Sequence, residues 1–277
     1  MSQAAFRQKW GAIRAGGKKS NLEEKNIYVE PGEVPRTQRQ LSLYHYFLFI
    51  KDHLSKIGAK NIIELGCGRG TIGLYCQTYL GLEVTLMDTE ENAIEIARQA
   101  FSTHRAAAHF LVGDALRTGL ASASFDATVS IGLAEHLDNV EDLFAEQYRI
   151  LRPGGIMISL NIPKKISVQY LNTAMRAVKK LVGLYEGSVT KDYYRNSYSA
   201  RQYEQFAKNA GFQRTAVVPV CPFPFYVPIS RPADRFVTSL RRGLLIVRAL
   251  FMKYPYKTNA LLAHSHFLVG YKPNHEK

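Results

Sequence analysis

The stretch "IIELGCGRGTIGLYC", residues 62–76, decides the fold. An apolar run ends in a carboxylate, Glu64, and three glycines follow at alternate positions, Gly66, Gly68 and Gly70. Glycine lets the chain turn tightly and lets its backbone come within contact distance of a ligand that a Cβ would block. We therefore interpret the stretch as a buried strand, a glycine turn that contacts a ligand, and the start of a helix.

Apolar runs that predict strands alternate with amphipathic runs that predict helices on both sides of this turn. A helix is predicted over 36–56, ending at Gly58. The other predicted helices cover 71–80, 90–101, 140–153 and 199–212, and the predicted strands cover 61–65, 83–88, 108–114, 125–131, 155–162, 214–220 and 265–272. Such alternation indicates an α/β fold with a doubly wound, mostly parallel sheet.

The chain of 277 residues, 46% of them hydrophobic, is large enough for one well-buried core with extensions. We expect one domain over 36–277, preceded by an arm over 1–35 that acts as a lid and contains a short helix around Trp10. Two insertions, 164–198 and 222–263, interrupt the alternation, and we expect them to be helical and to form a cap over the substrate.

The net charge of +13 is unevenly distributed. It is +6 for residues 1–60, −7 for 61–163 and +14 for 164–277. An acidic partner, a membrane surface or an anionic substrate is therefore expected to meet the flanks of the glycine turn. No apolar run is long enough to span a membrane, which predicts a cytoplasmic protein, and three cysteines without ligand spacing predict neither a disulfide framework nor a metal site.

The spacing around the turn indicates the kind of ligand. The glycines form GxGxG with Glu64 two positions before, and Thr71 stands where a dinucleotide-binding GxGxxG has its third glycine. A carboxylate there would repel a pyrophosphate but attract the ammonium and sulfonium charges of S-adenosylmethionine. Asp88 ends the next strand, 22 positions after Gly66, where an acidic side chain can bind a ribose, and Asp114 is placed to bind adenine. The alternatives are a helix cap for Asp88 and a turn for Asp114.

Taken together, these residues resemble the class I S-adenosylmethionine-dependent methyltransferases, in particular their small-molecule, methyltransferase type 11-like branch. The resemblance covers about 36–163, 199–221 and 264–272. The matching segments are "ELGCGRG" (64–70), "LMD" (86–88), "GDA" (113–115), "FDATVSIGLAEHL" (125–137), "LRPGG" (151–155) and "AGF" (210–212). It implies a seven-stranded sheet with the last strand antiparallel, and S-adenosyl-L-methionine as the cofactor, leaving as S-adenosyl-L-homocysteine. The expected cofactor-binding residues are Glu64, Gly66, Cys67, Gly68, Gly70, Asp88, Thr89, Asp114, Ala115 and Ile131.

Methyl transfer from a sulfonium is an in-line displacement that needs neither a metal nor a covalent nucleophile. A general base helps when the acceptor is a hydroxyl, and His136, after the fourth predicted strand, is our first catalytic candidate, with Glu135 as the second. The alternative is that His136 orients a loop or caps a helix. Tyr44, Tyr193 and Tyr194 are candidates for binding the substrate and enclosing the methyl group, and Trp10 for closing over the cofactor, with structural packing as the alternative for each.

An amphipathic helix is predicted over 231–253. Phe236, Leu240, Leu244, Val247 and Phe251 fall on one face. On one side this stripe is flanked by Arg235, Arg242 and Lys253, and on the other by Arg241 and Arg248. The helix could make peripheral contact with a membrane or cover the pocket, and both fit a lipophilic or anionic acceptor.

We therefore predict O-methylation of a small, bulky, apolar or anionic metabolite. "SIGLAEHL" also resembles the "SIGxxEH" segment of cyclopropane fatty acid synthases, so C-methylation or cyclopropanation of a lipid-like acceptor is an alternative. A tRNA or rRNA methyltransferase would explain the basic flanks, but the sequence after the fourth predicted strand has no Asn/Asp-Pro-Pro-Tyr/Phe or Pro-Cys motif, which argues against a nucleic acid partner. A non-enzymatic cofactor-binding role is the remaining alternative.

Overall fold

The structure is a computed structural model that describes residues 7–11, 27–162, 195–220, 231–251, 263 and 265–274. Residues 7–11 form a helical turn, in agreement with the helix expected around Trp10. The first predicted insertion lies outside the described residues except for its last positions.

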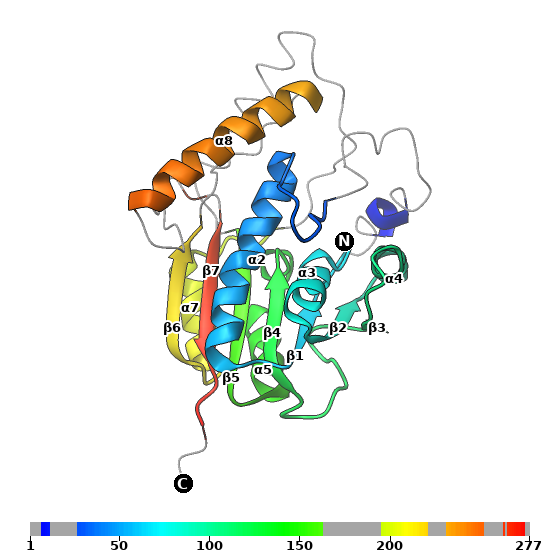
Figure 1. The fold of residues 1–277 in the computed structure, drawn as a ribbon. Helices are drawn as coiled ribbons and strands as arrows, with labels where there is room; N and C mark the ends of the chain where they lie inside the picture. The colour runs from blue at the N-terminus through cyan, green and yellow to red at the C-terminus, as the bar shows by residue number, and fades with distance from the viewer. Residues whose placement is uncertain are drawn as a thin grey trace, which may run out of the picture.

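Seven strands form a single sheet in the order β3-β2-β1-β4-β5-β7-β6 (Figure 1). The strands are β1 (Asn61–Leu65), β2 (Glu83–Asp88), β3 (His109–Val112), β4 (Phe125–Ile131), β5 (Leu151–Asn161), β6 (Gln213–Pro219) and β7 (His266–Tyr271). The first five pair in parallel, whereas β7 runs antiparallel to both of its neighbours, β5 and β6. The predicted doubly wound, mostly parallel sheet with an antiparallel last strand is confirmed.

Helices cover both faces of the sheet. They are α2 (Gln38–Ile57), α3 (Thr71–Leu80), α4 (Glu91–Thr103), the 3₁₀ turn η2 (Ala134–His136), α5 (Val140–Ile150), α7 (Ala200–Asn209) and α8 (Arg231–Phe251). On one face α2, α3 and α4 pack in a core that includes Ile62 of β1. On the other face α5 and α7 pack in a core that includes Ile63. Neighbouring residues of one strand serve opposite cores because successive side chains of a strand point to opposite faces.

The start of β5 differs from the prediction. The sequence predicted a helix to residue 153 and a strand from 155, but α5 ends at Ile150 and β5 begins at Leu151, which pairs with Phe125. Pro153 cannot donate the backbone hydrogen bond that a continued helix would need, so the chain extends before it. The early extension lets β5 run alongside the whole of β4.

Helix α8 lies across the end of the molecule at which the parallel strands finish, next to the beginning of α2 (Figure 1). It is held there by buried Gln38, whose amide nitrogen and amide oxygen each form a hydrogen bond with a side chain of α8. Asp234 Oδ1 accepts from Gln38 Nε2 at 2.7 Å, and Arg241 Nη1 donates to Gln38 Oε1 at 2.7 Å. None of the helices that the structure describes combines the length and the apolar character needed to cross a membrane.

Candidate active site

The glycine turn follows β1 and is tied to the end of β2. Gly66, Gly68 and Gly70 have φ values of 64°, 54° and 65°, a region that glycine enters without the steric cost of a Cβ. The amide of Cys67 donates to the Met87 carbonyl at 3.0 Å, and the amide of Gly68 donates to Asp88 Oδ2 at 2.9 Å. The turn therefore holds the ends of two adjacent parallel strands together, at the edge of the sheet where ligands bind in such folds.

Glu64 places a carboxylate behind this turn. Its side chain is 3% exposed, and Oε2 accepts a hydrogen bond of 2.8 Å from the amide of Gly73 in the first turn of α3. Burial raises the pKa of Glu64 to about 8, although the Gly73 hydrogen bond acts in the opposite direction. A cation that came close to this carboxyl group would favour its ionised form.

Asp88 connects the glycine turn to the start of α4. Besides the bond from Gly68, its Oδ1 accepts from the amide of Glu90 at 3.0 Å. Burial raises its pKa, and the opposing effects come from the Glu90 and Gly68 amides and from the charge of Lys9. The N-cap residue of α4 is Glu90, so Asp88 closes the turn that leads into this helix and is not itself the cap.

A cavity of about 400 Å³ opens at this edge, within the size range of small-molecule sites. Nine of the ten predicted cofactor-binding residues line it: Glu64, Gly66, Cys67, Gly68, Asp88, Thr89, Asp114, Ala115 and Ile131. The structure therefore brings together side chains from the ends of β1, β2 and β4 and from the loop after β3. Polar and apolar walls both contribute, and the apolar part includes Leu43, Leu133 and Leu137.

Gly70, the tenth predicted residue, lies outside this lining. A Cβ added to it would come within 2.7 Å of Leu86 Cδ1 and 3.2 Å of Ala97 Cβ, on the opposite side of the turn. Its missing Cβ lets α3 begin close to β2, and its contact with the cofactor stays a prediction. At Gly66 and Gly68 the neighbours are residues of the cavity itself: an added Cβ would lie 2.9 Å from Leu133 and 2.9 Å from Trp10.

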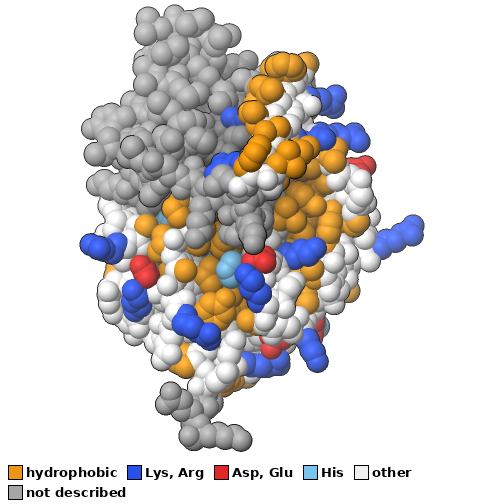
Figure 2. Space-filling model, turned by 60° about the vertical axis from the view of Figure 1, so that its left-hand side comes forward, with side chains coloured by type: hydrophobic (Ala, Val, Ile, Leu, Met, Phe, Trp, Pro, Cys, Tyr) orange, Lys and Arg blue, Asp and Glu red, His pale blue; other side chains and the backbone are white. Residues whose placement is uncertain are grey.

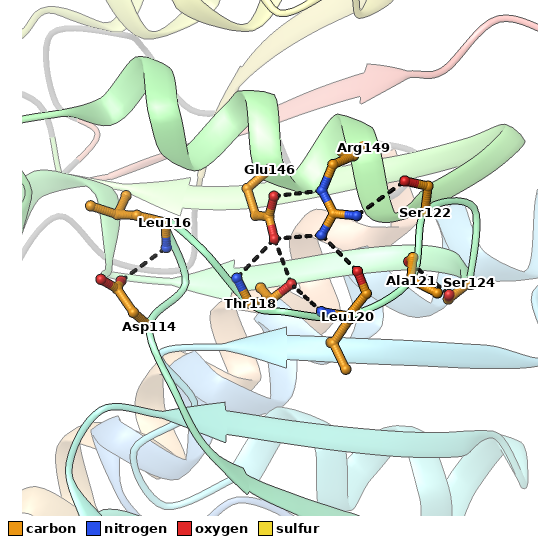
Figure 3. A network of polar contacts seen from close by, with 9 residues as sticks. All are labelled: Asp114, Leu116, Thr118, Leu120, Ala121, Ser122, Ser124, Glu146 and Arg149. Carbon is orange, nitrogen blue, oxygen red and sulfur yellow. Dashed lines mark hydrogen bonds and ion pairs between the residues drawn. The ribbon is translucent and has the colours of Figure 1, made fainter.

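Asp114 lines the cavity, but its carboxylate is engaged locally. Oδ1 accepts from the amide of Leu116 at 2.9 Å, which closes the turn after β3 (Figure 3). The next residues of this loop are fastened to α5, since Glu146 Oε1 accepts from the amide of Thr118 at 2.8 Å and from Arg149 Nη2 at 2.8 Å. The alternative of a turn role is thus observed, and binding of adenine by Asp114 stays a prediction.

The two catalytic candidates are placed differently. His136, at the end of η2, is half-buried and lines the cavity. Glu135 is 1% exposed and is not part of that lining, and burial raises its pKa to about 7. In the part of the chain that the structure describes, its Oε2 has no hydrogen-bond partner. The carboxyl group of Glu135 is thus buried, and its catalytic role stays a prediction.

The sequence reasoning missed Asn196, which holds η2 in place. Its amide N–H donates to the Glu135 carbonyl at 2.7 Å, and its Nδ2 donates to the carbonyls of Ala134 at 2.7 Å and Leu137 at 2.9 Å. Tyr203 in turn donates to Asn196 Oδ1 at 2.7 Å. Asn196 thereby fixes the backbone on both sides of His136, and no spacing pattern in the sequence signals this contact.

The predicted substrate-binding tyrosines are not gathered at the cavity. Tyr44 lies in an aromatic cluster between α2 and α3, where ring centroids are 5.9 Å from Tyr75 and 6.2 Å from Tyr79, and it is not among the described residues of the lining. The structural-packing alternative therefore describes Tyr44. Tyr193 and Tyr194 lie outside the described residues.

The N-terminal arm contributes to the cavity directly. Lys9 and Trp10 both line it, and the end of the Trp10 ring lies next to Gly68. Arg7 Nε lies 3.7 Å from Oε2 of Glu90, another residue of the cavity lining. From α2, Arg39 also lines the cavity, a contribution that the sequence did not indicate.

Comparison with known proteins agrees with this geometry. Residues 63–159 match the family model described as a methyltransferase domain. The chain is 33% identical over 117 residues to a malonyl-[acyl-carrier protein] O-methyltransferase of Enterobacter lignolyticus, covering 42% of this chain and 44% of that protein. It is 32% identical over 112 residues to a demethylmenaquinone methyltransferase of Leptospira interrogans, covering 39% and 45%. The chain thus matches less than half the length of these curated relatives.

The fold extends further than the sequence similarity. The solved structure of the [4+2]-cyclase SpnF has a TM-score of 0.61 over 99% of this chain and 95% of its own, at 16% identity. The fold is that of a doubly wound α/β domain. The matched segment is more specific: residues 63–159 are similar to a methyltransferase domain, and this similarity supports S-adenosylmethionine as the cofactor.

Proposed function

We propose that the protein transfers the methyl group of S-adenosylmethionine to an oxygen of a small, bulky, apolar or anionic acceptor. The observation that carries the proposal is that the glycine turn with Glu64, Asp88 on the neighbouring strand, and His136 all open onto one cavity. A buried carboxyl group and a tight glycine turn suit a ligand with a cationic amino acid end. The bound cofactor would supply the electrophilic methyl group.

In this proposal the residues of the chain position the reactants and exclude water. Glu64 and Asp88 hold the polar ends of the cofactor, and Thr89, Ala115 and Ile131 form walls around it. His136 accepts the acceptor's hydroxyl proton at a ring nitrogen while the new bond forms, the usual role of a neutral imidazole. Asn196 acts as a positioning residue, because it holds the backbone on both sides of His136.

The other residues that line the cavity indicate the chemical nature of the acceptor. Leucines from α2 and from the segment around η2 give the cavity an apolar side, and the basic side chains of Lys9, Arg39 and Arg69 also line it. That combination suits a molecule with an apolar body and a negative group. One of the two relatives reported above is an O-methyltransferase by name, which supports oxygen as the acceptor atom.

We also propose that the arm over 1–35 closes the cofactor cavity, that 222–263 covers the acceptor, and that 231–253 meets a membrane surface. Lys9 and Trp10 support the first part because they already line the cavity. The position of α8 at the same end of the molecule supports the others (Figure 1).

The experiment is an incubation of the full chain with S-adenosylmethionine and fractionated cell extracts, followed by mass spectrometry for products that gain the mass of CH₂. Calorimetry with S-adenosylhomocysteine and, separately, with a nicotinamide dinucleotide tests the cofactor. The expected result is binding of the first compound only, with a methylated product in a lipid or organic-acid fraction. Binding of the dinucleotide instead, or cofactor binding with no methylated product in any fraction, would contradict the proposal.

Two variants test the role of His136 once a product is known. His136→Ala is expected to lower kcat by about 10²- to 10⁴-fold and to remove the acidic limb of the pH–rate profile, because the base is lost. Asn196→Ala is expected to lower kcat while the limb stays, because the imidazole is displaced but present. An unchanged kcat in His136→Ala would favour an acceptor that needs no base, such as a carboxylate or a carbon centre.

A further inference from the structure

The outward face of α8 is the largest apolar feature on the surface that the structure describes. Of the nine large hydrophobic side chains that are exposed among the described residues, seven belong to this one helix: Phe236, Leu240, Leu244, Ile246, Val247, Leu250 and Phe251. Figure 2 shows this band of hydrophobic side chains along α8, bordered by Lys and Arg side chains. Exposed apolar patches of this kind mark interaction sites.

The opposite face of α8 is the one that packs on the protein. Thr238 is fully buried and Leu245 is 8% exposed, whereas Leu240 and Leu244 are 57% and 60% exposed. At 100° per residue Thr238 and Leu245 lie opposite the exposed stripe. The helix therefore lies flat, with its inner face on the domain and its whole apolar stripe turned outward.

Charge complementarity indicates what covers the stripe. Arg235 and Arg242 fall on one flank and Arg241 and Arg248 on the other, at about 110° to 130° from the centre of the seven-residue stripe. Asp234 is the only acidic residue of α8, and its carboxylate is bonded to Gln38. Beside the stripe the helix thus presents only positive charge.

We propose that α8 docks onto an anionic lipid bilayer, with the stripe entering the interface and the flanking Arg235 and Arg248 meeting phosphate headgroups, while Arg241 stays bonded to Gln38. A helix with one apolar face and basic flanks is the form that lies in the plane of a membrane. Near Gly243 the stripe is hollowed between Phe236, Leu240 and Leu244, which leaves room for part of an acyl chain. This inference rests on the proposed function, because it identifies the surface from which a lipophilic acceptor would reach the cavity.

The same helix is connected to the cavity wall. Asp234 and Arg241 hold Gln38, the next residue Arg39 lines the cavity, and Leu43 follows one helical turn later. Docking of α8 would therefore set the start of α2, and with it one side of the cavity, close to the lipid surface.

The test is co-sedimentation of the full chain with vesicles of phosphatidylcholine, with and without added phosphatidylglycerol. We expect binding to the anionic vesicles, weaker binding to the neutral ones, and weakening of the former as salt is raised. The double variant Leu240→Asp, Leu244→Asp should reduce partitioning at least about tenfold, because each leucine contributes its burial energy. Arg235→Glu should reduce it about 30-fold, because the variant removes one basic residue, worth about fivefold near an anionic surface, and adds a charge of the opposite sign.

Two control variants test whether a change of charge elsewhere on the surface also alters vesicle binding. Val112→Asp introduces the same charge at a side chain of similar exposure, 59%, on β3, and Lys51→Glu reverses an exposed charge on α2. Neither is expected to change vesicle binding. The stripe residues are more than half exposed, so aspartate there buries no charge, and S-adenosylhomocysteine affinity measured by calorimetry should be retained in the double variant.

Three outcomes would overturn the inference. They are no binding of the wild type to anionic vesicles, equal binding of the double variant, and a wild-type dimer that the double variant dissociates, which would make the stripe an interface between copies. Absence of vesicle binding with S-adenosylhomocysteine binding intact defeats only this inference. Absence of S-adenosylhomocysteine binding with vesicle binding intact defeats only the proposed function.

Discussion

Arg241 and Gln38 lie 203 positions apart in sequence, yet Arg241 Nη1 donates to Gln38 Oε1 over 2.7 Å. Asp234 Oδ1 accepts from the other end of the same amide, so α8 satisfies the whole side chain of the first residue of α2. Gln38 is 1% exposed. Removal of the Gln38 amide would leave Asp234 and Arg241 without these hydrogen bonds, so this contact is a polar link between α8 and the sheet domain.

Replacing Gln38 by leucine tests that link. The variant keeps the size of the side chain but removes both hydrogen bonds, and we expect the free energy of unfolding to fall by about 2 kcal/mol, as measured by urea denaturation. The control is Gln99→Leu on the exposed side of α4, expected to change stability by less than about 0.5 kcal/mol. Equal stability of the two variants would show that α8 is held by other contacts.

The raised pKa of Glu64 predicts how cofactor affinity depends on pH. A cationic ligand favours the ionised carboxylate, but with a pKa of about 8 the group is protonated at neutral pH before the ligand binds. Binding should therefore release a proton, and affinity should rise by up to about tenfold per pH unit below pH 8 and level off above it. Calorimetry of S-adenosylmethionine binding in buffers of different ionisation enthalpy measures both effects.

The variant Glu64→Gln is expected to bind more weakly and to lose this pH dependence. The same substitution bears on the stability of the ligand-free protein. Because the folded-state pKa of about 8 exceeds the ordinary value of 4.5, the folded state holds more protons between these values. The free energy of unfolding of the wild type should therefore fall as pH rises through this window. In Glu64→Gln it should fall less steeply, and the remaining slope comes from Glu135, whose pKa is also raised. A pH-independent affinity in the wild type would refute a role of Glu64 in binding a cation.

Gly70 and Gly81 stand at the two ends of α3 and offer a matched pair. Both have a φ of 65°, but an added Cβ meets Leu86 at 2.7 Å in Gly70 and nothing within 4 Å in Gly81. Gly81→Ala should cost about 1 kcal/mol from the backbone conformation alone. Gly70→Ala should cost a further ~1 to 3 kcal/mol because α3 and β2 must separate.

Thermal or urea unfolding of both alanine variants measures the difference. Similar losses for the two would mean that α3 moves away from β2 without cost. Glycine would then be needed at position 70 for its positive φ and not for close packing of α3 on β2.

Trp10 is the only tryptophan in the chain, so its fluorescence reports on the arm alone. Its ring lies next to Gly68 in the cavity lining. If the arm closes over the cofactor, titration with S-adenosylhomocysteine should change the emission along the same curve that calorimetry gives for binding. A parallel titration of N-acetyltryptophanamide corrects for absorption of light by the ligand. If the emission of the protein stays constant until the site is saturated, Trp10 does not close over the cofactor.

The parts of the fold that were predictable from the sequence are those whose signals are local. The bounds of β1, β2, β4 and α3 agree with the predicted segments, because glycines and polar residues interrupt the apolar runs at those positions. The start of β5 was wrong because its first residues pair with β4, a contact that periodicity does not contain. Helix α8 shows the same limit: its stripe was predicted correctly, but only the structure shows that the stripe faces outward.

The site divides in the same way. Motif spacing was sufficient to gather Glu64, Asp88 and Asp114 at one cavity, since the ends of adjacent parallel strands meet at one edge. It could not distinguish His136 from Glu135, which are neighbours in sequence but lie on different sides of η2. Asn196 could not be found at all, because the three hydrogen bonds that it donates to the segment around η2 end on backbone carbonyls, which leave no side-chain pattern.

The position of β7 between β5 and β6 has a consequence for biosynthesis. During translation β6 emerges before β7, but among the strands that the structure describes it pairs only with β7. Until residues 266–271 have left the ribosome, β6 and the outer edge of β5 lack the strand that joins them. The nascent chain must therefore carry an incomplete sheet with α8 already synthesised, and a chaperone that shields that open edge would raise the yield of the finished protein.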